Sequence, residues 1–260
     1  MDLGLAGKVA LVTGSSRGIG ASITEGLAAE GCDVMLTGRD EAALKEVAAT
    51  VAKHGRKAHY STLDLSGAKA SAALIADHKK HFGRLDILVN NAGATKRGDF
   101  RELTDTDWKD GFELKFFAHV RLAREAWPLL VASQGSLVTI AGIGGKEPEA
   151  EFGIGSSVNA ACVAWSKALA DVGKKEGVQV NTVNPGRVET ERLWRRIRAR
   201  VKETGESEAS IRSEYLKEFN ITRFGVVEDI TGLIAFMASR HGRWLHGATI
   251  DMDGGEVRGL

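Results

Sequence analysis

Cysteine, proline and tyrosine are all scarce in this chain of 260 residues. The two cysteines, Cys32 and Cys162, form no Cys-x-x-Cys pair, so the sequence suggests neither a disulfide framework nor a metal site such as a zinc centre. Only three prolines interrupt the helical patterns. The two tyrosines, Tyr60 and Tyr215, leave the middle of the chain without a phenol group. Any chemistry that requires a tyrosine there is excluded.

Long hydrophobic runs and an excess of charge are also absent. No uninterrupted apolar stretch reaches the roughly 18 residues that a membrane span requires, and residues 1–8 lack the basic and apolar regions of a secretion signal. The 35 basic and 34 acidic residues give a net charge of +1. Nucleic-acid and membrane surfaces usually need a marked basic excess. We therefore expect a cytoplasmic protein that binds neither nucleic acid nor membranes.

Short apolar runs alternate with helical patterns longer than ten residues along the whole chain. The runs are almost entirely apolar, as expected of strands covered on both faces. The alternation predicts βαβ units and an α/β fold in one domain over residues 1–260: a three-layer, doubly wound parallel sheet of about seven strands with helices on both faces. The expected strands are 9–12, 33–37, 58–63, 87–89, 136–140, 178–183 and 248–251. The expected helices include 20–30, 42–54, 67–82, 106–132 and 156–175.

A glycine-rich turn follows the first expected strand. Gly14, Gly18 and Gly20 form a Gly-x-x-x-Gly-x-Gly pattern between an apolar run and an amphipathic helix. Glycine lets the backbone turn tightly and approach a ligand without a Cβ clash, and the free N–H groups of a helix N-terminus attract phosphate. The strand–turn–helix context therefore predicts a site for a dinucleotide pyrophosphate rather than an ordinary turn.

Two further motifs accompany this turn, Asp86-Ile-Leu-Val-Asn-Asn-Ala-Gly93 and Val183-Asn-Pro-Gly-Arg-Val-Glu-Thr190. With residues 9–20 they make the chain resemble the classical short-chain dehydrogenases/reductases over nearly its whole length. The resemblance implies a Rossmann fold, a nicotinamide cofactor and a small-molecule substrate. It also implies a homo-oligomer, a tetramer or dimer, whose interface the long helices supply. The charged segment 191–219 would form a flap over the substrate.

The resemblance also assigns residues to the cofactor. Arg39 ends the second strand at the family's position for a cation that meets the 2′-phosphate of NADP, and Arg17 lies in the glycine turn. A guanidinium matches a phosphate bidentately, which favours NADP(H) over NAD(H), while Asp40 leaves NAD(H) open. Asp64 would touch the adenine and Asn90 the ribose. The other implied contacts are Gly14, Ser16, Gly18, Ile19, Gly20, Leu65, Ala92, Gly93, Pro185, Gly186, Val188 and Thr190.

The catalytic positions that the resemblance implies do not hold the family's residues. Family members transfer a proton with a Tyr-x-x-x-Lys pair, supported by a serine and an asparagine. Aligned through residues 166–170, the tyrosine position holds Gly155 and the lysine position Asn159. The serine position holds Gly142, and the asparagine position holds Lys115. Because glycine replaces bulky groups, the sequence predicts a wider substrate site than in relatives.

Lys115 and Asn159 exchange the lysine and asparagine of the family, which would keep an ammonium and an amide in the same small volume. Lys115, its pKa lowered by burial, would then bind the ribose or act as the acid. Coincidence after loss of selection is the alternative. Other candidate donors are His119, one helical turn after Lys115, and Ser156 and Glu151 near the tyrosine position. Their simpler interpretations are a packed helix histidine, a weak acid without a base, and a solvated loop.

Three functions are consistent with these observations. The first is an NADP(H)-dependent oxidoreductase that acts on a carbonyl or hydroxyl group with a non-standard active site. The second is a catalytically inactive NAD(P)-binding protein, a sensor or scaffold. The third is a lyase-like or isomerase-like activity, against which the intact nucleotide motifs argue. General acid–base catalysis contributes about 10²–10⁴-fold, so losing the tyrosine would slow hydride transfer without forbidding it.

Overall fold

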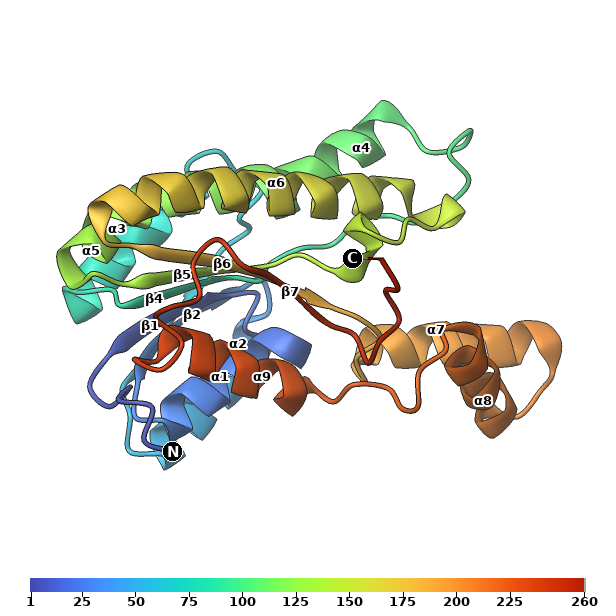
Figure 1. Cartoon of the computed structure of the whole chain (residues 1–260), viewed down its shortest axis with the longest axis horizontal. Helices are drawn as coiled ribbons and strands as arrows, with labels where there is room; N and C mark the ends of the chain where they lie inside the picture. The colour runs from blue at the N-terminus through green and yellow to red at the C-terminus, as the bar shows by residue number, and fades with distance from the viewer. Residues whose placement is uncertain (260) are drawn as a thin grey trace.

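A seven-stranded sheet forms the centre of the structure, a computed structural model that describes residues 1–259 (Figure 1). The strand order is β3-β2-β1-β4-β5-β6-β7, and every neighbouring pair is parallel. The predicted doubly wound α/β sheet is confirmed. The strands are β1 (Val9–Thr13), β2 (Asp33–Gly38), β3 (Ala58–Thr62), β4 (Ile87–Asn90), β5 (Ser136–Ile140), β6 (Gln179–Pro185) and β7 (Thr249–Met252).

Helices cover both faces of the sheet (Figure 1). One layer holds α1 (Gly18–Ala29), α2 (Glu41–Lys53) and α9 (Val227–Ala238), and the other holds α3 (Ala70–Phe82), α5 (Ala118–Ser133) and α6 (Gly153–Glu176). α9 is not among the expected helices. It packs closely on α1. A Cβ at Gly26 of α1 would lie only 2.1 Å from the Cγ2 atom of Thr231 of α9, so the contact requires glycine. The Ser22 and Thr231 hydroxyls also form a 2.7 Å hydrogen bond between the two helices.

The long helix expected over residues 106–132 is interrupted. α4 (Asp105–Phe112) continues into a π-helical segment, η1 (Glu113–Phe117), before α5 begins. A π-turn widens the helix locally and often occurs at functional sites. Lys115 lies in the middle of this segment, so its position differs from that in a regular helix.

Alternating residues of the strands fill two separate cores. In β1, Ala10 and Val12 face the layer of α1, α2 and α9, whereas Leu11 faces the layer of α3, α5 and α6. The strand order reverses between β1 and β4. In doubly wound sheets ligands bind beyond the carboxyl ends of the strands at such a point, and the glycine turn after β1 lies there.

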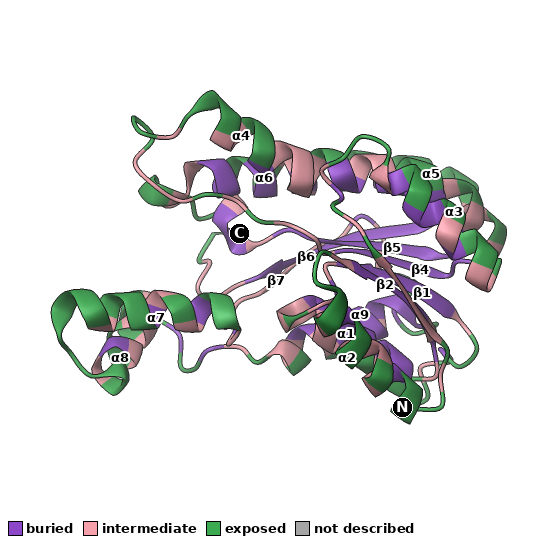
Figure 2. Cartoon of the chain, turned by 180° about the vertical axis from the view of Figure 1, so that it is seen from behind, coloured by how far each residue is buried: buried purple, intermediate pink, exposed green. Residues whose placement is uncertain are grey.

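The segment expected to form a flap is helical and projects from the carboxyl side of the sheet (Figures 1 and 2). It comprises α7 (Glu191–Thr204) and α8 (Glu208–Glu218). A small core of its own includes Leu193, Ile197 and Ile211. Within residues 1–259, no helix combines the length and the apolar character that a membrane span requires.

Candidate functional site

The glycine turn adopts conformations that only glycine tolerates well. Gly14 and Gly18 have φ angles of +65° and +57°, in the left-handed region that other residues rarely enter. A Cβ at Gly20 would lie 2.3 Å from the carbonyl oxygen of Gly14. The turn is therefore held tightly against the N-terminus of α1, as the sequence pattern predicts.

A hydrogen-bonded clamp joins the ends of β1 and β4 beside this turn. The Thr13 hydroxyl accepts the N–H groups of Asn91 and Ala92 at 2.8 and 2.9 Å, and the Asn91 amide donates to the Thr13 carbonyl at 2.8 Å. Sequence reasoning missed Asn91, although it neighbours Asn90 in the second motif. Asn90 itself is fully buried and donates to the carbonyl of His119 at 3.4 Å. Its amide therefore points into the protein, and any contact of Asn90 with the ribose would come from its backbone, so the assignment stays a prediction.

Arg39 and Asp64 lie together where β2 and β3 end. The Arg39 Nη1 atom is 3.8 Å from the Asp64 Oδ2 atom, and the side chains are 64% and 49% exposed. Asp40 instead caps α2 by accepting the Ala43 N–H at 3.1 Å. Asp40 is thus engaged in its own helix, whereas the Arg39 guanidinium remains open to a ligand.

The third motif faces the first. A Cβ at Gly18 would lie 3.5 Å from the Cγ2 atom of Thr190, which precedes α7.

The remaining residues that the resemblance assigns to the cofactor fall into two groups. Partly exposed are Ser16, Ile19, Ala92, Gly93 and Gly186, and buried are Leu65, Pro185 and Val188. Side chains of the buried group belong to the protein interior, and the assignment of both groups to the cofactor stays a prediction.

Lys115 and Asn159 meet directly. The Lys115 ammonium donates to the Asn159 Oδ1 atom at 2.6 Å and to the Ala141 carbonyl at 2.7 Å. Gly93 makes this arrangement possible, since a Cβ there would lie 2.8 Å from the Lys115 Cδ atom. The structure therefore brings an ammonium and an amide into one small volume, as the exchange of the two residue types predicts.

Burial above all, together with the nearby positive charge of Arg192, lowers the pKa of Lys115 to about 8. Arg192 approaches because its guanidinium donates to the Gly93 carbonyl at 3.1 Å. An ammonium has three N–H donors, and two of those of Lys115 are taken. Within residues 1–259 the third has no hydrogen-bond partner in the protein, which leaves it available to a ligand oxygen.

Gly155, which the family resemblance places at the tyrosine position, does not widen the site. Gly142 has a φ angle of +146°, and a Cβ there would lie 3.0 Å from the Asn159 Nδ2 atom. A Cβ at Gly155 would lie 2.1 Å from two ring atoms of Phe152. The prediction of a wider site is therefore wrong at position 155, because the Phe152 ring fills the space. Phe152 precedes Gly155 by three residues, a spacing that could have revealed the contact.

The other candidate proton donors are less suitable than Lys115. Burial lowers the pKa of His119 to about 3, and its Nε2 atom lies 2.8 Å from the Ala92 carbonyl. The imidazole therefore stays neutral and donates to that carbonyl. The Ser156 hydroxyl is buried without a hydrogen-bond partner in residues 1–259, and Glu151 is exposed. The structure thus fits the simpler interpretations of these three side chains: a packed helix histidine, a weak acid without a base, and a residue of a solvated loop.

An ion-pair network links α7 to the rest of this region, and sequence reasoning did not anticipate it. Glu149 pairs with Arg97, with Arg187 at 3.0 Å and with Arg196 of α7 at 3.9 Å. Arg187 also pairs with Glu256 near the C-terminus at 2.8 Å. Segments that are distant in sequence thus meet around Glu149 and Arg187.

Comparisons with known proteins agree with this geometry. Residues 8–200 match the short chain dehydrogenase family model. L-sorbose reductase from Gluconobacter frateurii, solved with NADPH and L-sorbose, is 32% identical with a TM-score of 0.96, and the match covers 100% of both chains. A short chain dehydrogenase from Burkholderia cenocepacia, solved with NADP, is 30% identical with a TM-score of 0.85, covering 97% of this chain and 98% of the other.

A curated sequence relative gives the same result. The 3-oxoacyl-acyl-carrier-protein reductase of Salmonella typhimurium is 29% identical over 250 residues, which are 96% of this chain and 97% of that protein. The family model spans well over half of the chain, and these similarities extend from one end to the other. The chain therefore belongs to the short-chain dehydrogenase/reductase family of NAD(P)-dependent oxidoreductases.

Proposed function

We propose that the protein is an NADP(H)-dependent oxidoreductase of a carbonyl or hydroxyl group in which Lys115, not a tyrosine, handles the proton. The observation that carries the proposal is the Lys115 ammonium, anchored by Asn159 and the Ala141 carbonyl with one N–H free. Lys115 lies beside Gly93, just beyond the carboxyl end of β4, and beside Ala141, which follows β5. In doubly wound sheets, ligands bind beyond the carboxyl ends of the strands.

The residues present fit a dinucleotide. Side chains at Gly14 or Gly18 would strain the backbone, and one at Gly20 would collide with the Gly14 carbonyl, so the turn keeps its N–H groups accessible to a pyrophosphate. Arg39 would meet a 2′-phosphate, and the capping role of Asp40 disfavours it as the ribose carboxylate of an NAD site. Solved relatives that contain NADPH or NADP support the same preference.

The bound cofactor would supply or accept a hydride. The chain's own part is to orient the substrate oxygen and to move one proton. With its pKa near 8, the Lys115 ammonium is charged at neutral pH and close enough to neutrality to release a proton. Its free N–H would donate to a carbonyl oxygen and deliver the proton as that oxygen becomes an alcohol. Asn159 and the Ala141 carbonyl would hold the amine in place throughout.

The decisive test combines cofactor binding with turnover. NADPH and NADH are titrated by fluorescence, and ketoses and 3-oxoacyl thioesters, substrates named for its relatives, are screened for NADPH oxidation. Lys115→Met should lower kcat about 10²–10⁴-fold while the Kd for NADPH changes little. Lys109→Met, which alters an exposed lysine of α4, should leave both unchanged.

Each other outcome points elsewhere. If the protein binds neither NADPH nor NADH, the proposal is wrong. NADPH binding without turnover of any carbonyl compound favours the inactive sensor or scaffold, and turnover that survives Lys115→Met assigns the proton to another group.

A further inference from the structure

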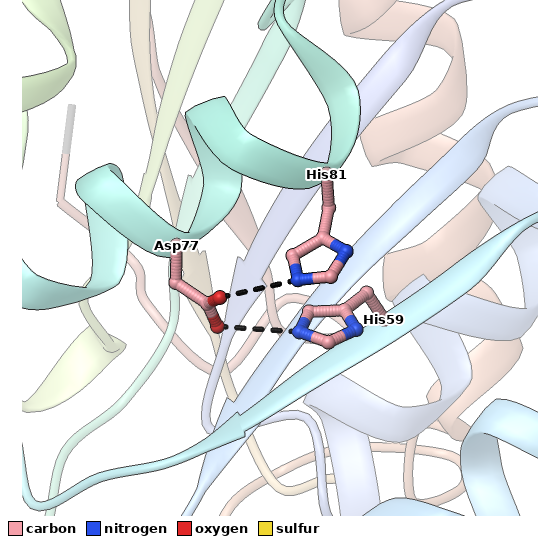
Figure 3. A group of neighbouring side chains, drawn as sticks. All are labelled: His59, Asp77 and His81. Atoms are coloured by element: carbon pink, nitrogen blue, oxygen red, sulfur yellow. Dashed lines mark hydrogen bonds and ion pairs between the residues drawn. The ribbon is translucent and has the colours of Figure 1, made fainter.

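Two histidines and an aspartate converge between β3 and α3, outside the site described above (Figure 3). His59 lies on β3, and Asp77 and His81 lie one helical turn apart on α3. We propose that these three side chains form a binding site for a divalent transition metal, Zn²⁺ above all. Their separation in sequence gives no compact ligand motif, which explains why residue spacing alone does not suggest it.

The distances suit zinc. The His59 Nε2 atom is 3.3 Å from Asp77 Oδ2, and the His81 Nε2 atom is 3.3 Å from Asp77 Oδ1. All three ligand atoms lie within 4.8 Å of one another. A tetrahedral zinc ion with bonds of about 2.0–2.1 Å separates its ligands by about 3.3–3.4 Å. Two imidazole nitrogens with one carboxylate oxygen form a donor set that suits zinc well.

The two imidazoles need only a small rearrangement to bind one ion. Their rings stack with centroids 3.5 Å apart and an interplanar angle of 18°, and both Nε2 atoms point toward the Asp77 carboxylate (Figure 3). A shared ion requires the two nitrogen lone pairs to converge, so the rings must tilt apart at the edge that faces Asp77. Each of the three side chains is about 30% exposed, so the rings have room and water can complete the coordination.

Asp77 is prepared for a cation. The Ser61 hydroxyl donates to its Oδ2 atom, as an outer-shell partner of a metal-binding carboxylate does. Among residues 1–259, no lysine or arginine forms an ion pair with Asp77, whose only ion-pair partners are the two histidines.

The site is independent of the proposed oxidoreductase function. His59 is the second residue of β3, whereas the residues assigned to the cofactor follow the carboxyl ends of the strands. An ion there would connect β3, an edge strand of the sheet, to the helix that packs beside it. Because an ion that binds only the folded chain stabilises it by mass action, the expected effect is on stability and not on turnover.

The experiment uses tag-free full-length protein that has been stripped with a chelator and dialysed. Zinc chloride is titrated by calorimetry, and Co²⁺ is added as a spectroscopic substitute. The unaltered chain should bind one zinc ion, show a Tm that rises with zinc, and give the visible absorption of tetrahedral cobalt. His59→Ala/His81→Ala should lose all three signals, and Ser61→Ala should weaken zinc binding roughly 10-fold or more. His54→Ala, which alters an exposed histidine, is the matched control.

Affinity for NADPH should be the same in every variant, which separates this proposal from the proposed function. The single variant His81→Gln preserves the size and polarity of the side chain and serves if the double variant does not fold. Zinc binding that is absent from the unaltered chain, or equal in the unaltered chain and the histidine variants, would show that the three side chains form a metal-free hydrogen-bonded group.

Discussion

Lys115 illustrates how surroundings set the chemistry of a single side chain. A lysine in water is a poor proton donor at neutral pH, because its pKa is about 10.4. Here burial and Arg192 bring the pKa to about 8, and two acceptors fix the amine. The family resemblance predicts that Lys115 lies close to Asn159. Its direct contact with Asn159 follows from the packing of α6 against the π-helical segment, which the sequence does not specify.

The pH dependence of turnover should follow this group. Carbonyl reduction needs the charged amine, so kcat should be constant below about pH 8 and fall tenfold per unit above it, where the amine loses its proton. Oxidation of the alcohol needs the neutral amine and should rise over the same range. Steady-state rates between pH 6 and 10 measure both, and a flat profile in the unaltered chain would remove Lys115 from the chemistry.

Arg39 should determine cofactor preference. A hydrogen bond between charged groups contributes about 1.5–3 kcal/mol, so Arg39→Ala should raise the Kd for NADPH roughly 10- to 100-fold and leave that for NADH unchanged. Asp40→Asn keeps the helix cap and tests the alternative, in which the Asp40 carboxylate accepts a hydrogen bond from the ribose of NADH. Should Asp40→Asn weaken NADH binding strongly, the carboxylate and not the guanidinium would face the ribose.

At the scale of elements, sequence pattern predicts most of the architecture. Apolar runs mark all seven strands to within two residues at each end, because doubly covered strands have little freedom in composition. The glycine turn is predictable because its backbone angles require glycine. The π-helical segment is not predictable in this way, since it depends on contacts with α4, α5 and α6. Those contacts decide the shape of the candidate site.

The Phe152 contact makes a sharp prediction about α6. Gly155→Ala would place a Cβ 2.1 Å from the ring, and overpacking of this kind typically costs about 1–3 kcal/mol. Gly153→Ala is the control in the same turn, because its Cβ would meet Trp108 at an ordinary 3.8 Å, and it should be neutral or stabilising by up to about 1 kcal/mol. Urea unfolding gives both values. Equal stabilisation in the two variants would mean that the ring moves aside freely.

At the scale of the whole molecule, chain order brings the three family motifs together although they are far apart in sequence. The switch between β1 and β4 places the glycine turn beside Asn91, and the crossover after β6 returns Thr190 to Gly18. The ion pairs around Glu149 and Arg187 then connect α7 and the C-terminal segment to the loop that follows β6. None of these contacts can be predicted from the sequence of a single segment.

We expect self-association through the layer of long helices. Phe117 of the π-helical segment and Val172 of α6 are 42% and 43% exposed, and large exposed apolar side chains in one layer suit an interface. Sedimentation velocity at micromolar concentration should show a dimer or tetramer, and Phe117→Asp should shift it toward monomer. A monomer in the unaltered chain would contradict the expectation, and the exposed Lys109→Asp serves as a control for added charge.

The Phe152 ring over Gly155 also limits which side chains this chain can carry at two positions. A tyrosine does not fit at position 155 while the ring remains, and Gly142 holds a backbone angle that disfavours serine. Introducing both side chains would therefore require a smaller residue in place of Phe152 and a changed backbone at position 142 at the same time.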